Sequence, residues 1–357
     1  MHPPRQPHGQ PILMGVPGPA LTAGTRALIR RLQPGGFILF GRNLAAPRQL
    51  FDLIAELYAL SDTTPIVTID QEGGRVSRLK LIGAEPPSAA QLCRAADADL
   101  IREHGALTGQ LLALFGINLD LAPVVDYAPT AGATADNSLR DRCYGATPDE
   151  VIANAGLFLD ALQAHGVRGT VKHFPGYTHC ARDPHGELPR VDRARAQLDA
   201  EELRAFRAFT GRADAFMVGH AHFPAWHPEP VPASLSAPII RELLINQLGY
   251  RGLVMTDDLE MGAVATRYGA RRATRQAIAA GAHLVMFCHN PACAELAHDT
   301  LALMSAAELR PALTALAAFK QHLPRIPAAF DAARFDEVNA RVKSLRERAL
   351  TLAARRG

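Results

Sequence analysis

Eight short runs of apolar and β-branched residues constrain the fold more than any other feature of this sequence. They span residues 12–16, 36–40, 65–69, 118–121, 169–173, 215–219, 252–256 and 283–288. Nearly continuous hydrophobicity is typical of parallel strands that are covered on both faces. Eight parallel strands that alternate with helices close a (β/α)8 barrel, so the sequence predicts an α/β protein with the TIM-barrel fold.

The segments between these runs carry helical patterns. Leu50, Leu53, Ile54 and Leu57, for example, recur at the spacing of one helix face. No strand-like run follows residue 288, so the chain from about residue 291 onward predicts helices that close over the barrel. We expect a flexible N-terminal tail over residues 1–11 and a single catalytic barrel domain over residues 12–357, without a second domain.

Composition excludes several classes of protein. The formal charge is only +3, and Lys and Arg are scattered among acidic residues, which argues against nucleic-acid binding. The first eight residues lack the apolar core of a secretory signal, and no segment approaches the roughly 20 apolar residues of a membrane span. Five cysteines without paired spacing indicate reduced thiols. We therefore expect a cytoplasmic protein with no membrane partner, and we favour a monomer.

Charged and imidazole side chains stand at or just beyond the ends of several runs. They are Asp70, Glu72, Arg75 and Arg78, then Asp120 and Asp126, then Lys172 and His173, then His220 and His222, and finally Asp257 and Asp258. The carboxyl ends of barrel strands meet at one rim, where the active sites of these enzymes lie. The sequence therefore predicts a shared polar pocket for a small molecule.

Four motifs in this order resemble glycoside hydrolase family 3. They are Ile-Asp-Gln-Glu-Gly-Gly-Arg-Val at 69–76, Lys-His-Phe-Pro-Gly at 172–176, Asp183-x-His185, and Thr-Asp-Asp-Leu-x-Met at 256–261. Within the family they resemble the short, single-domain β-N-acetylhexosaminidases of cell-wall recycling. The similarity runs from about residue 12 to about residue 288.

The resemblance implies that Asp257 is the catalytic nucleophile. A carboxylate at the end of the seventh strand can attack an anomeric carbon and form a glycosyl-enzyme ester, as in retaining glycosidases. The alternative role is that of a helix N-cap after this strand, which Asp258 fits as well or better.

The resemblance also implies an unusual acid/base, His185, oriented by Asp183 two residues earlier on a loop. A carboxylate bonded to one ring nitrogen fixes the tautomer and raises the basicity of the other nitrogen. The imidazole can then protonate the leaving oxygen and later deprotonate water.

Residues that would hold the substrate follow from the same resemblance. Asp70 would bind hydroxyls of the non-reducing sugar, and the groups around the same ring would be Arg78, Arg142, Lys172 and His173. The motif around Arg142 matches the family more loosely than the others, and the alternative for this residue is a loop salt bridge with Asp141.

One departure from the family falls in the acid/base loop. Tyr177-Thr178 stands where the family usually has His-Gly after Phe-Pro-Gly, and His179 and Cys180 follow. The spacing from Lys172 to the Asp-x-His pair is kept. The change therefore bears on the resting conformation of the loop and on leaving-group preference, rather than on the reaction class.

Three alternatives stay open. His220-x-His222 could belong to a metal-dependent amidohydrolase, but that superfamily opens with such a pair, whereas this one follows the sixth strand; we expect His220 in the pocket wall and His222 in a loop. His179-Cys180 with His185 is a weaker metal candidate. A catalytically silent muropeptide-binding barrel and a β-glycoside phosphorylase of the same fold are the other two.

The function that the sequence favours is a retaining exo-β-N-acetylglucosaminidase that uses no metal or cofactor. By resemblance, it removes non-reducing N-acetylglucosamine from peptidoglycan fragments, in which this sugar is linked β-1,4 to anhydro-N-acetylmuramic acid, with or without a peptide.

Overall fold

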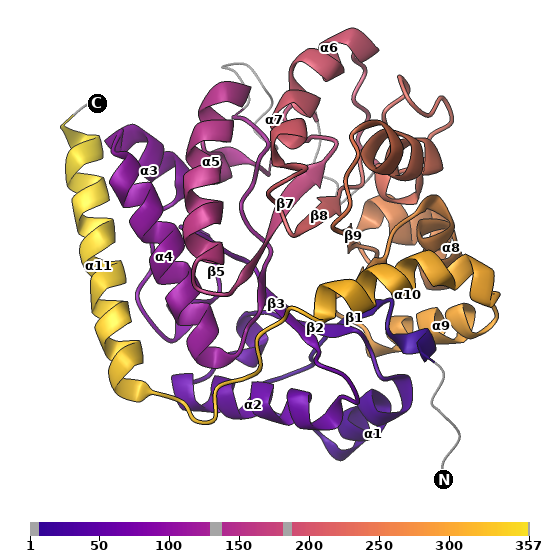
Figure 1. Ribbon diagram of the computed structural model, residues 1–357, viewed down its shortest axis with the longest axis horizontal. Helices are drawn as coiled ribbons and strands as arrows, with labels where there is room; N and C mark the ends of the chain where they lie inside the picture. The colour runs from indigo at the N-terminus through magenta and orange to yellow at the C-terminus, as the bar shows by residue number, and fades with distance from the viewer. Residues whose placement is uncertain (1–6, 129–137, 181–187, 356–357) are drawn as a thin grey trace.

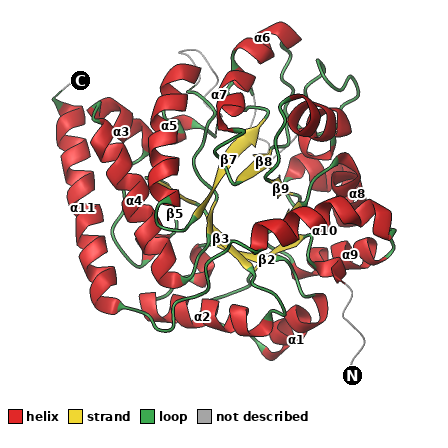
Figure 2. Cartoon of the chain, in the orientation of Figure 1, coloured by secondary structure: helices red, strands yellow, loops and turns green. Residues whose placement is uncertain are grey.

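The fold is a closed barrel of eight parallel strands, as the sequence predicts (Figures 1 and 2). The computed structural model describes residues 7–128, 138–180 and 188–355. Around the barrel the strand order is β1-β10-β9-β8-β7-β6-β3-β2. The strands are β1 (Ile12–Gly15), β2 (Gly36–Leu39), β3 (Ile66–Ile69), β6 (Leu119–Asp120), β7 (Arg168–Phe174), β8 (Ala215–Val218), β9 (Leu253–Asp258) and β10 (Leu284–Phe287).

Helices surround the barrel and cover the outward faces of its strands (Figure 2). They are α1 (Ala23–Leu32), α2 (Pro47–Leu60), α3 (Ala89–Ala95), α4 (Ala98–Phe115), α5 (Pro148–Gln163), α6 (Arg195–Ala200), α7 (Glu202–Phe209), the π-helix η6 (Pro238–Gln247) and α8 (Gly262–Ala280). The predicted apolar face of α2 is confirmed, because Leu50, Leu53, Ile54 and Leu57 are all buried. Short 3-10 helices are η1 (Pro7–Gly9), η2 (Gly41–Asn43), η3 (Leu79–Leu81), η4 (Arg140–Arg142) and η5 (Ala233–Leu235).

The chain after β10 is helical in the described residues, in agreement with the sequence. It forms α9 (Pro291–Ala302), α10 (Ala306–Lys320) and α11 (Ala332–Ala354). Leu316 of α10, together with Leu323, packs onto the apolar side chains inside the barrel. The helix α11 packs against α3 and α4 at the edge of the molecule (Figure 1). The helix α10 and Leu323 thus close the barrel at the end opposite the predicted pocket.

The described chain includes a packed segment ahead of residue 12, where the barrel domain is expected to begin. The helix η1 lies before β1, and its Gly9 is buried. A Cβ atom at Gly9 would lie 1.7 Å from the carbonyl oxygen of Leu32, at the end of α1. The backbone of η1 therefore lies directly against the barrel surround.

A two-stranded hairpin follows β3 and was not predicted from the sequence. It pairs β4 (Gln71–Gly73) with β5 (Val76–Ser77) in antiparallel fashion. Gly73 and Gly74 have positive φ angles of 109° and 53°, which side chains other than glycine rarely adopt. The Gly-Gly pair therefore makes the turn that brings Arg78 back toward the end of β3.

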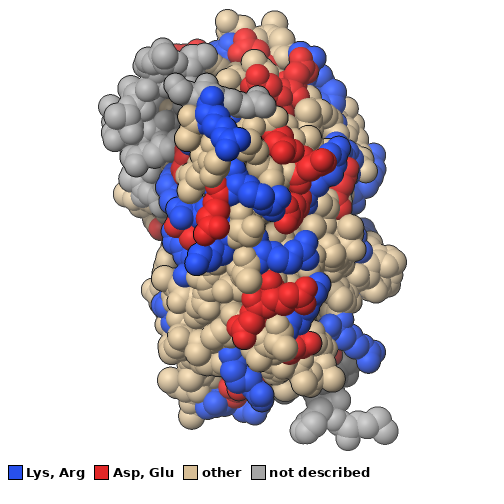
Figure 3. Space-filling model, turned by 90° about the vertical axis from the view of Figure 1, so that its left-hand side faces the viewer, with Lys and Arg blue, Asp and Glu red and all other residues tan. Residues whose placement is uncertain are grey.

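Three further observations bear on the expected class of protein. Within the described residues, no helix combines the length and apolar character needed to cross a membrane. The five cysteines form no disulfide bond among these residues. On the face of the molecule in Figure 3, basic and acidic side chains are interspersed, which is the pattern of a solvated surface rather than a basic binding face.

Candidate active site

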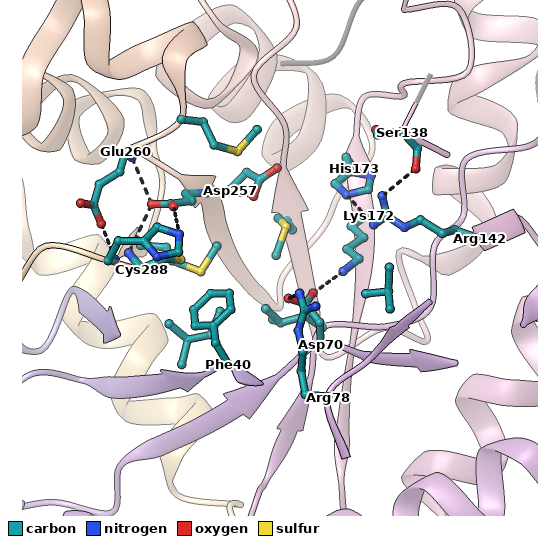
Figure 4. Close-up of a pocket in the computed structure, with 18 of the residues that line it drawn as sticks. Phe40, Asp70, Arg78, Ser138, Arg142, Lys172, His173, Asp257, Glu260 and Cys288 are labelled. Carbon is teal, nitrogen blue, oxygen red and sulfur yellow. Dashed lines mark hydrogen bonds and ion pairs between the residues drawn. The ribbon is translucent and has the colours of Figure 1, made fainter. Parts of the chain in front are cut away.

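A pocket of about 590 Å³ opens at the carboxyl ends of the barrel strands. The structure brings together in its wall all the predicted site residues that it describes: Asp70, Arg78, Arg142, Lys172, His173 and Asp257 (Figure 4). Asp183 and His185 lie outside the described residues. Six side chains from distant parts of the chain thus converge as the strand-end pattern predicts.

The floor of the pocket is a network of paired charges centred on Lys172. Its ammonium nitrogen lies 2.8 Å from Asp70 Oδ1 and 2.6 Å from Glu72 Oε1, and the side chain is only 2% exposed. Arg78 adds a second cation 3.2 Å from Asp70 Oδ2. Burial raises the pKa of Asp70, but the charges of Lys172 and Arg78 outweigh burial and hold this pKa well below its ordinary range. Asp70 is therefore an ionised hydrogen-bond acceptor at neutral pH.

Arg142 is held by Glu72 rather than by Asp141, which corrects the alternative considered from the sequence. Its Nε and Nη2 atoms each lie 2.8 Å from one oxygen of Glu72. Asp141 instead pairs with Arg75, at 2.9 Å. Burial raises the pKa of Glu72, yet Arg142 and then Lys172 bring it down to about 2. Glu72 thus orders two cations of the pocket, a role that the sequence did not indicate.

His173 is oriented by Asp126, a buried residue for which the sequence suggested no specific partner. Its Nδ1 lies 2.8 Å from Asp126 Oδ2, and the same oxygen accepts the backbone N–H of His173 at 3.0 Å. The other oxygen accepts the N–H of Tyr177 at 2.7 Å. Because Asp126 Oδ2 acts as the acceptor for this backbone N–H, Nδ1 is the donor in the bond between the two side chains, and Nε2 faces Arg142 at 3.4 Å.

Tyr177, the departure from the family motif, lines the pocket between β7 and β8. Its ring stacks on His173, with centroids 4.7 Å apart and an interplanar angle of 18°. Its hydroxyl accepts a hydrogen bond from the backbone N–H of His220 at 2.5 Å. Thr178 donates to the carbonyl oxygen of Tyr127 at 2.8 Å. The chain just ahead of the predicted acid/base pair is therefore attached to its neighbours through both substituted residues.

Asp257 and Asp258, at the end of β9, have different environments. Both border the pocket, and Asp257 Oδ1 accepts the N–H of Asp258 at 2.8 Å. Asp258 Oδ1 accepts N–H groups of Glu260 and Cys288, at 3.0 and 3.3 Å. Burial raises the pKa of Asp258 to about 7.

The expected N-cap role is wrong for Asp258. The helix α8 begins at Gly262, and Met261 is its N-cap. Asp258 instead caps the turn that follows β9.

The structure corrects the expected place of His220, whereas His222 lies in the chain that follows β8, as expected. His220 is fully buried behind the pocket rather than in its wall. Its Nδ1 lies 2.8 Å from Ser234 Oγ, and its Nε2 lies 2.8 Å from the carbonyl oxygen of Asp258. His222 is buried as well, and its Nε2 lies 2.9 Å from the carbonyl oxygen of His227. Because both nitrogens of His220 are bonded, the pair does not fit a metal site.

An ion-pair cluster lies beside the predicted acid/base loop. Ligand-type atoms of His179, Glu201 and Glu202 lie within 4.8 Å of one another. The Arg193 guanidinium lies among them, 2.8 Å from Glu201 and 3.1 Å from Glu202. His179 Nδ1 lies 2.5 Å from Glu202. Arg193 already supplies the cation here, so the cluster is a salt-bridge network that joins both ends of the loop.

The barrel and its carboxylate-lined rim pocket define the class of protein, an enzyme that acts on a polar small molecule. A family model described as the N-terminal domain of glycosyl hydrolase family 3 matches residues 10–316. The chain belongs to glycoside hydrolase family 3, and it is a glycoside hydrolase.

Relatives in sequence carry the name beta-hexosaminidase. The protein from Alkalilimnicola ehrlichii is 34% identical over 288 residues, which cover 79% of this chain and 81% of the relative. The one from Pseudomonas aeruginosa (strain LESB58) is 30% identical over 287 residues, or 80% of this chain and 84% of the relative.

Solved structures of the family share the fold. A family 3 β-N-acetylglucosaminidase from Paenibacillus sp. str. FPU-7 is 33% identical with a TM-score of 0.84, and the match covers 97% of this chain and 69% of that chain. NagZ from Neisseria gonorrhoeae, in complex with N-trifluoroacetyl-D-glucosamine, is 26% identical with a TM-score of 0.81, covering 94% and 97%.

Proposed function

We propose that this protein is a retaining exo-β-N-acetylglucosaminidase of the cytoplasm that acts on peptidoglycan fragments. It removes N-acetylglucosamine from the non-reducing end, where this sugar is linked to anhydro-N-acetylmuramic acid, with or without a peptide. The observation that carries the proposal is Asp257, which faces a pocket whose opposite side holds Asp70, Lys172 and His173 (Figure 4). Relatives named beta-hexosaminidase support the amino-sugar class.

The charges of the pocket suit a neutral sugar. Lys172 and Arg78 both pair with Asp70, and Arg142 pairs with Glu72. A neutral ring can exchange hydrogen bonds with these groups without separating the ion pairs. Asp70 accepts hydrogen bonds from sugar hydroxyls, while Lys172 and Arg78 donate to hydroxyl oxygens. These contacts hold the ring so that its anomeric carbon meets Asp257.

Reaction proceeds in two displacements. In the first, a carboxylate oxygen of Asp257 forms a bond to the anomeric carbon as the glycosidic C–O bond breaks, and His185 gives its proton to the leaving oxygen. In the second, His185 takes a proton from water, whose oxygen attacks the anomeric carbon and releases Asp257. Asp183 would hold the imidazole in the required tautomer. The roles of Asp183 and His185 rest on the family resemblance alone.

The test compares aryl β-glycosides of N-acetylglucosamine, glucose and xylose side by side. We expect the highest kcat/KM with N-acetylglucosamine, and release of this sugar from a disaccharide with anhydro-N-acetylmuramic acid. A preference for glucose or xylose would reject the substrate class. Faster turnover in phosphate than in an inert buffer, with a sugar 1-phosphate as product, would show a phosphorylase. A pure binding protein would give no turnover of any glycoside.

A further inference from the structure

His220 lies directly behind the end of β9, on the side away from the pocket. It follows β8, its side chain has no exposed surface, and it does not border the cavity. Its backbone N–H donates to Tyr177 of the β7 loop, and its ring reaches the backbone of Asp258. The residue therefore links the ends of three neighbouring strands, β7, β8 and β9.

The tautomer of His220 follows from its two ring contacts. A carbonyl oxygen only accepts hydrogen bonds, so Nε2 carries the proton and donates it to the carbonyl of Asp258 at 2.8 Å. The unprotonated Nδ1 accepts from the hydroxyl of Ser234, also at 2.8 Å. Ser234 is itself held by its backbone N–H, which donates to the carbonyl of Gly219 at 3.0 Å. The donor on Nε2 is thus built into the fold.

The hydrogen bond from His220 continues to the proposed nucleophile. Nε2–H fixes the carbonyl oxygen of Asp258, and the N–H of the same residue donates to Asp257 Oδ1 at 2.8 Å. These two groups belong to neighbouring peptide units that meet at the Cα of Asp258, so a shift of this Cα would move the N–H that holds one oxygen of Asp257. The direction of the Asp257 carboxylate therefore depends on a contact made on the far side of the strand.

We propose that His220 is a positioning residue for the nucleophile, acting through the backbone of Asp258. This inference rests on the proposed role of Asp257. His220 touches neither the pocket nor the substrate, so it acts on the attack at the anomeric carbon and not on sugar binding or proton transfer. Fixed geometry of this kind matters because a misplacement of about 1 Å can cost roughly 100-fold in rate.

Two amide substitutions separate this role from a general packing role. In His220→Gln the side-chain amide nitrogen can occupy the place of Nε2 and donate to the carbonyl of Asp258. In His220→Asn the amide reaches only as far as Nδ1, so this carbonyl loses its donor. We expect His220→Asn to lower kcat/KM roughly 10- to 100-fold, and His220→Gln to stay within about 5-fold of the wild-type enzyme.

A positioning role predicts that the rate of nucleophilic attack falls by the same factor with every substrate. In His220→Asn, kcat/KM, which reports the attack of Asp257, should fall by the same factor with activated and unactivated aryl glycosides, because the acid/base is untouched. Inactivation by a 5-fluoro glycosyl reagent, which needs the same attack, should slow equally. Competitive inhibition by the product sugar should stay unchanged, which reports an intact pocket. Three outcomes would each overturn the proposal. The first is an equal loss of rate in His220→Asn and His220→Gln, and the second is a loss of rate that grows with the basicity of the leaving group. The third is a weakening of product binding that matches the loss of rate.

Ser234→Ala gives an independent test should His220→Asn fail to fold. Without the hydroxyl, Nδ1 loses its donor and the imidazole is held at one ring nitrogen only, so a smaller uniform fall in kcat/KM is expected. Ser236→Ala is the matched control, since Ser236 Oγ makes a similar 2.7 Å contact with His227 Nδ1. A Ser234→Ala enzyme no slower than Ser236→Ala would reject the role of His220.

These measurements are made with whichever aryl glycoside the wild-type enzyme turns over. If the enzyme prefers a sugar other than N-acetylglucosamine, the assay substrate changes, but the comparison between the variants stays the same. Failure of the positioning role would leave the substrate preference as it is.

Discussion

Arg142 and Glu72 form a two-point ion pair with both nitrogen-to-oxygen distances at 2.8 Å. The two side chains are 12% and 5% exposed, and Glu72 also holds Lys172 at 2.6 Å. One buried carboxylate thus balances two cations of the pocket. Such a pair contributes little net stability when intact, but removal of one partner leaves buried charge without compensation.

The first prediction is that Glu72→Gln destabilises the protein strongly. Loss of one partner of a buried pair costs about 3–5 kcal/mol, and urea unfolding followed by circular dichroism measures it. Asp141→Asn is the matched control, because its pair with Arg75 is 37% and 43% exposed and should be worth less than about 1 kcal/mol. Equal losses in the two variants would contradict the central place of Glu72.

A second prediction concerns Asp257. Asp257→Ala should abolish turnover while the far-ultraviolet circular dichroism stays that of the wild type. A 2-fluoro or 5-fluoro glycosyl inhibitor should become esterified to Asp257, because its carboxylate faces the pocket. Peptide mapping by mass spectrometry locates the label. A label on Asp258 or Glu72 would reject the assignment.

The third prediction is an uneven effect of His185→Ala. General acid assistance is worth roughly 10²- to 10⁴-fold, so a natural sugar leaving group should suffer by about that factor. Nitrophenolate, which is stable without a proton, should depart almost normally. Deglycosylation still needs a base, so a burst of nitrophenolate is expected. A uniform loss without a burst would move the search for the acid/base to His173, His179 and Glu187.

A fourth prediction uses Asp120, a buried carboxyl. Its Oδ1 accepts the N–H of Gln71 at 3.0 Å, and its Oδ2 has no hydrogen-bond partner among the described residues. Burial raises the pKa of Asp120 to about 8. The protonated form is favoured in the folded protein, so this contribution to stability is fully present below pH of about 4 and is lost as the pH rises through about 8.

Asp120→Asn removes this ionisation. Relative to wild type, the variant should gain stability between pH 5 and pH 8 in urea unfolding experiments. Asp192→Asn, at a largely exposed carboxylate, is the control and should follow the wild-type curve. A pH dependence unchanged by Asp120→Asn would show that Asp120 ionises in its ordinary range.

The fifth prediction is that exhaustive chelation leaves activity unchanged. Both ring nitrogens of His220 are bonded to protein atoms, and Arg193 supplies the cation at His179, Glu201 and Glu202. Activity is measured before and after removal of divalent ions. Loss of activity that added zinc restores would contradict this expectation.

The barrel could be predicted because each strand is a local apolar run, and local patterns are what a sequence displays. The pocket could be predicted because parallel strands place their carboxyl ends at one rim. The hydrogen-bond partners of the pocket residues could not be predicted from the sequence. Asp126 lies 47 positions before His173, and Glu72 lies 70 positions before Arg142. Hydrogen bonds across such separations leave no periodic signal in the sequence.

The contacts of His220 and His222 could not be predicted from the sequence either. The His-x-His spacing allowed, as the less favoured alternative, two imidazoles directed at one metal ion, since alternate residues of a strand share a face. In the structure their nitrogens bond to different backbone carbonyls, those of Asp258 and His227. The strand β8 ends at Val218, before both histidines. The alternation of side chains along a strand therefore does not apply to this pair.

Tyr177 and Gly219 restrict the order in which mutations can accumulate. A Cβ atom at Gly219 would lie 2.4 Å from the Tyr177 hydroxyl oxygen, so every larger residue at 219 is blocked while the tyrosine remains. Exchange of Tyr177 for a shorter side chain opens that space first, and a side chain at 219 then becomes acceptable. Once it is in place, the return to tyrosine is blocked in turn. The two positions therefore change in a fixed order: from this sequence, directed evolution that changes one residue at a time must alter position 177 before position 219, and the reverse path must restore Gly219 first.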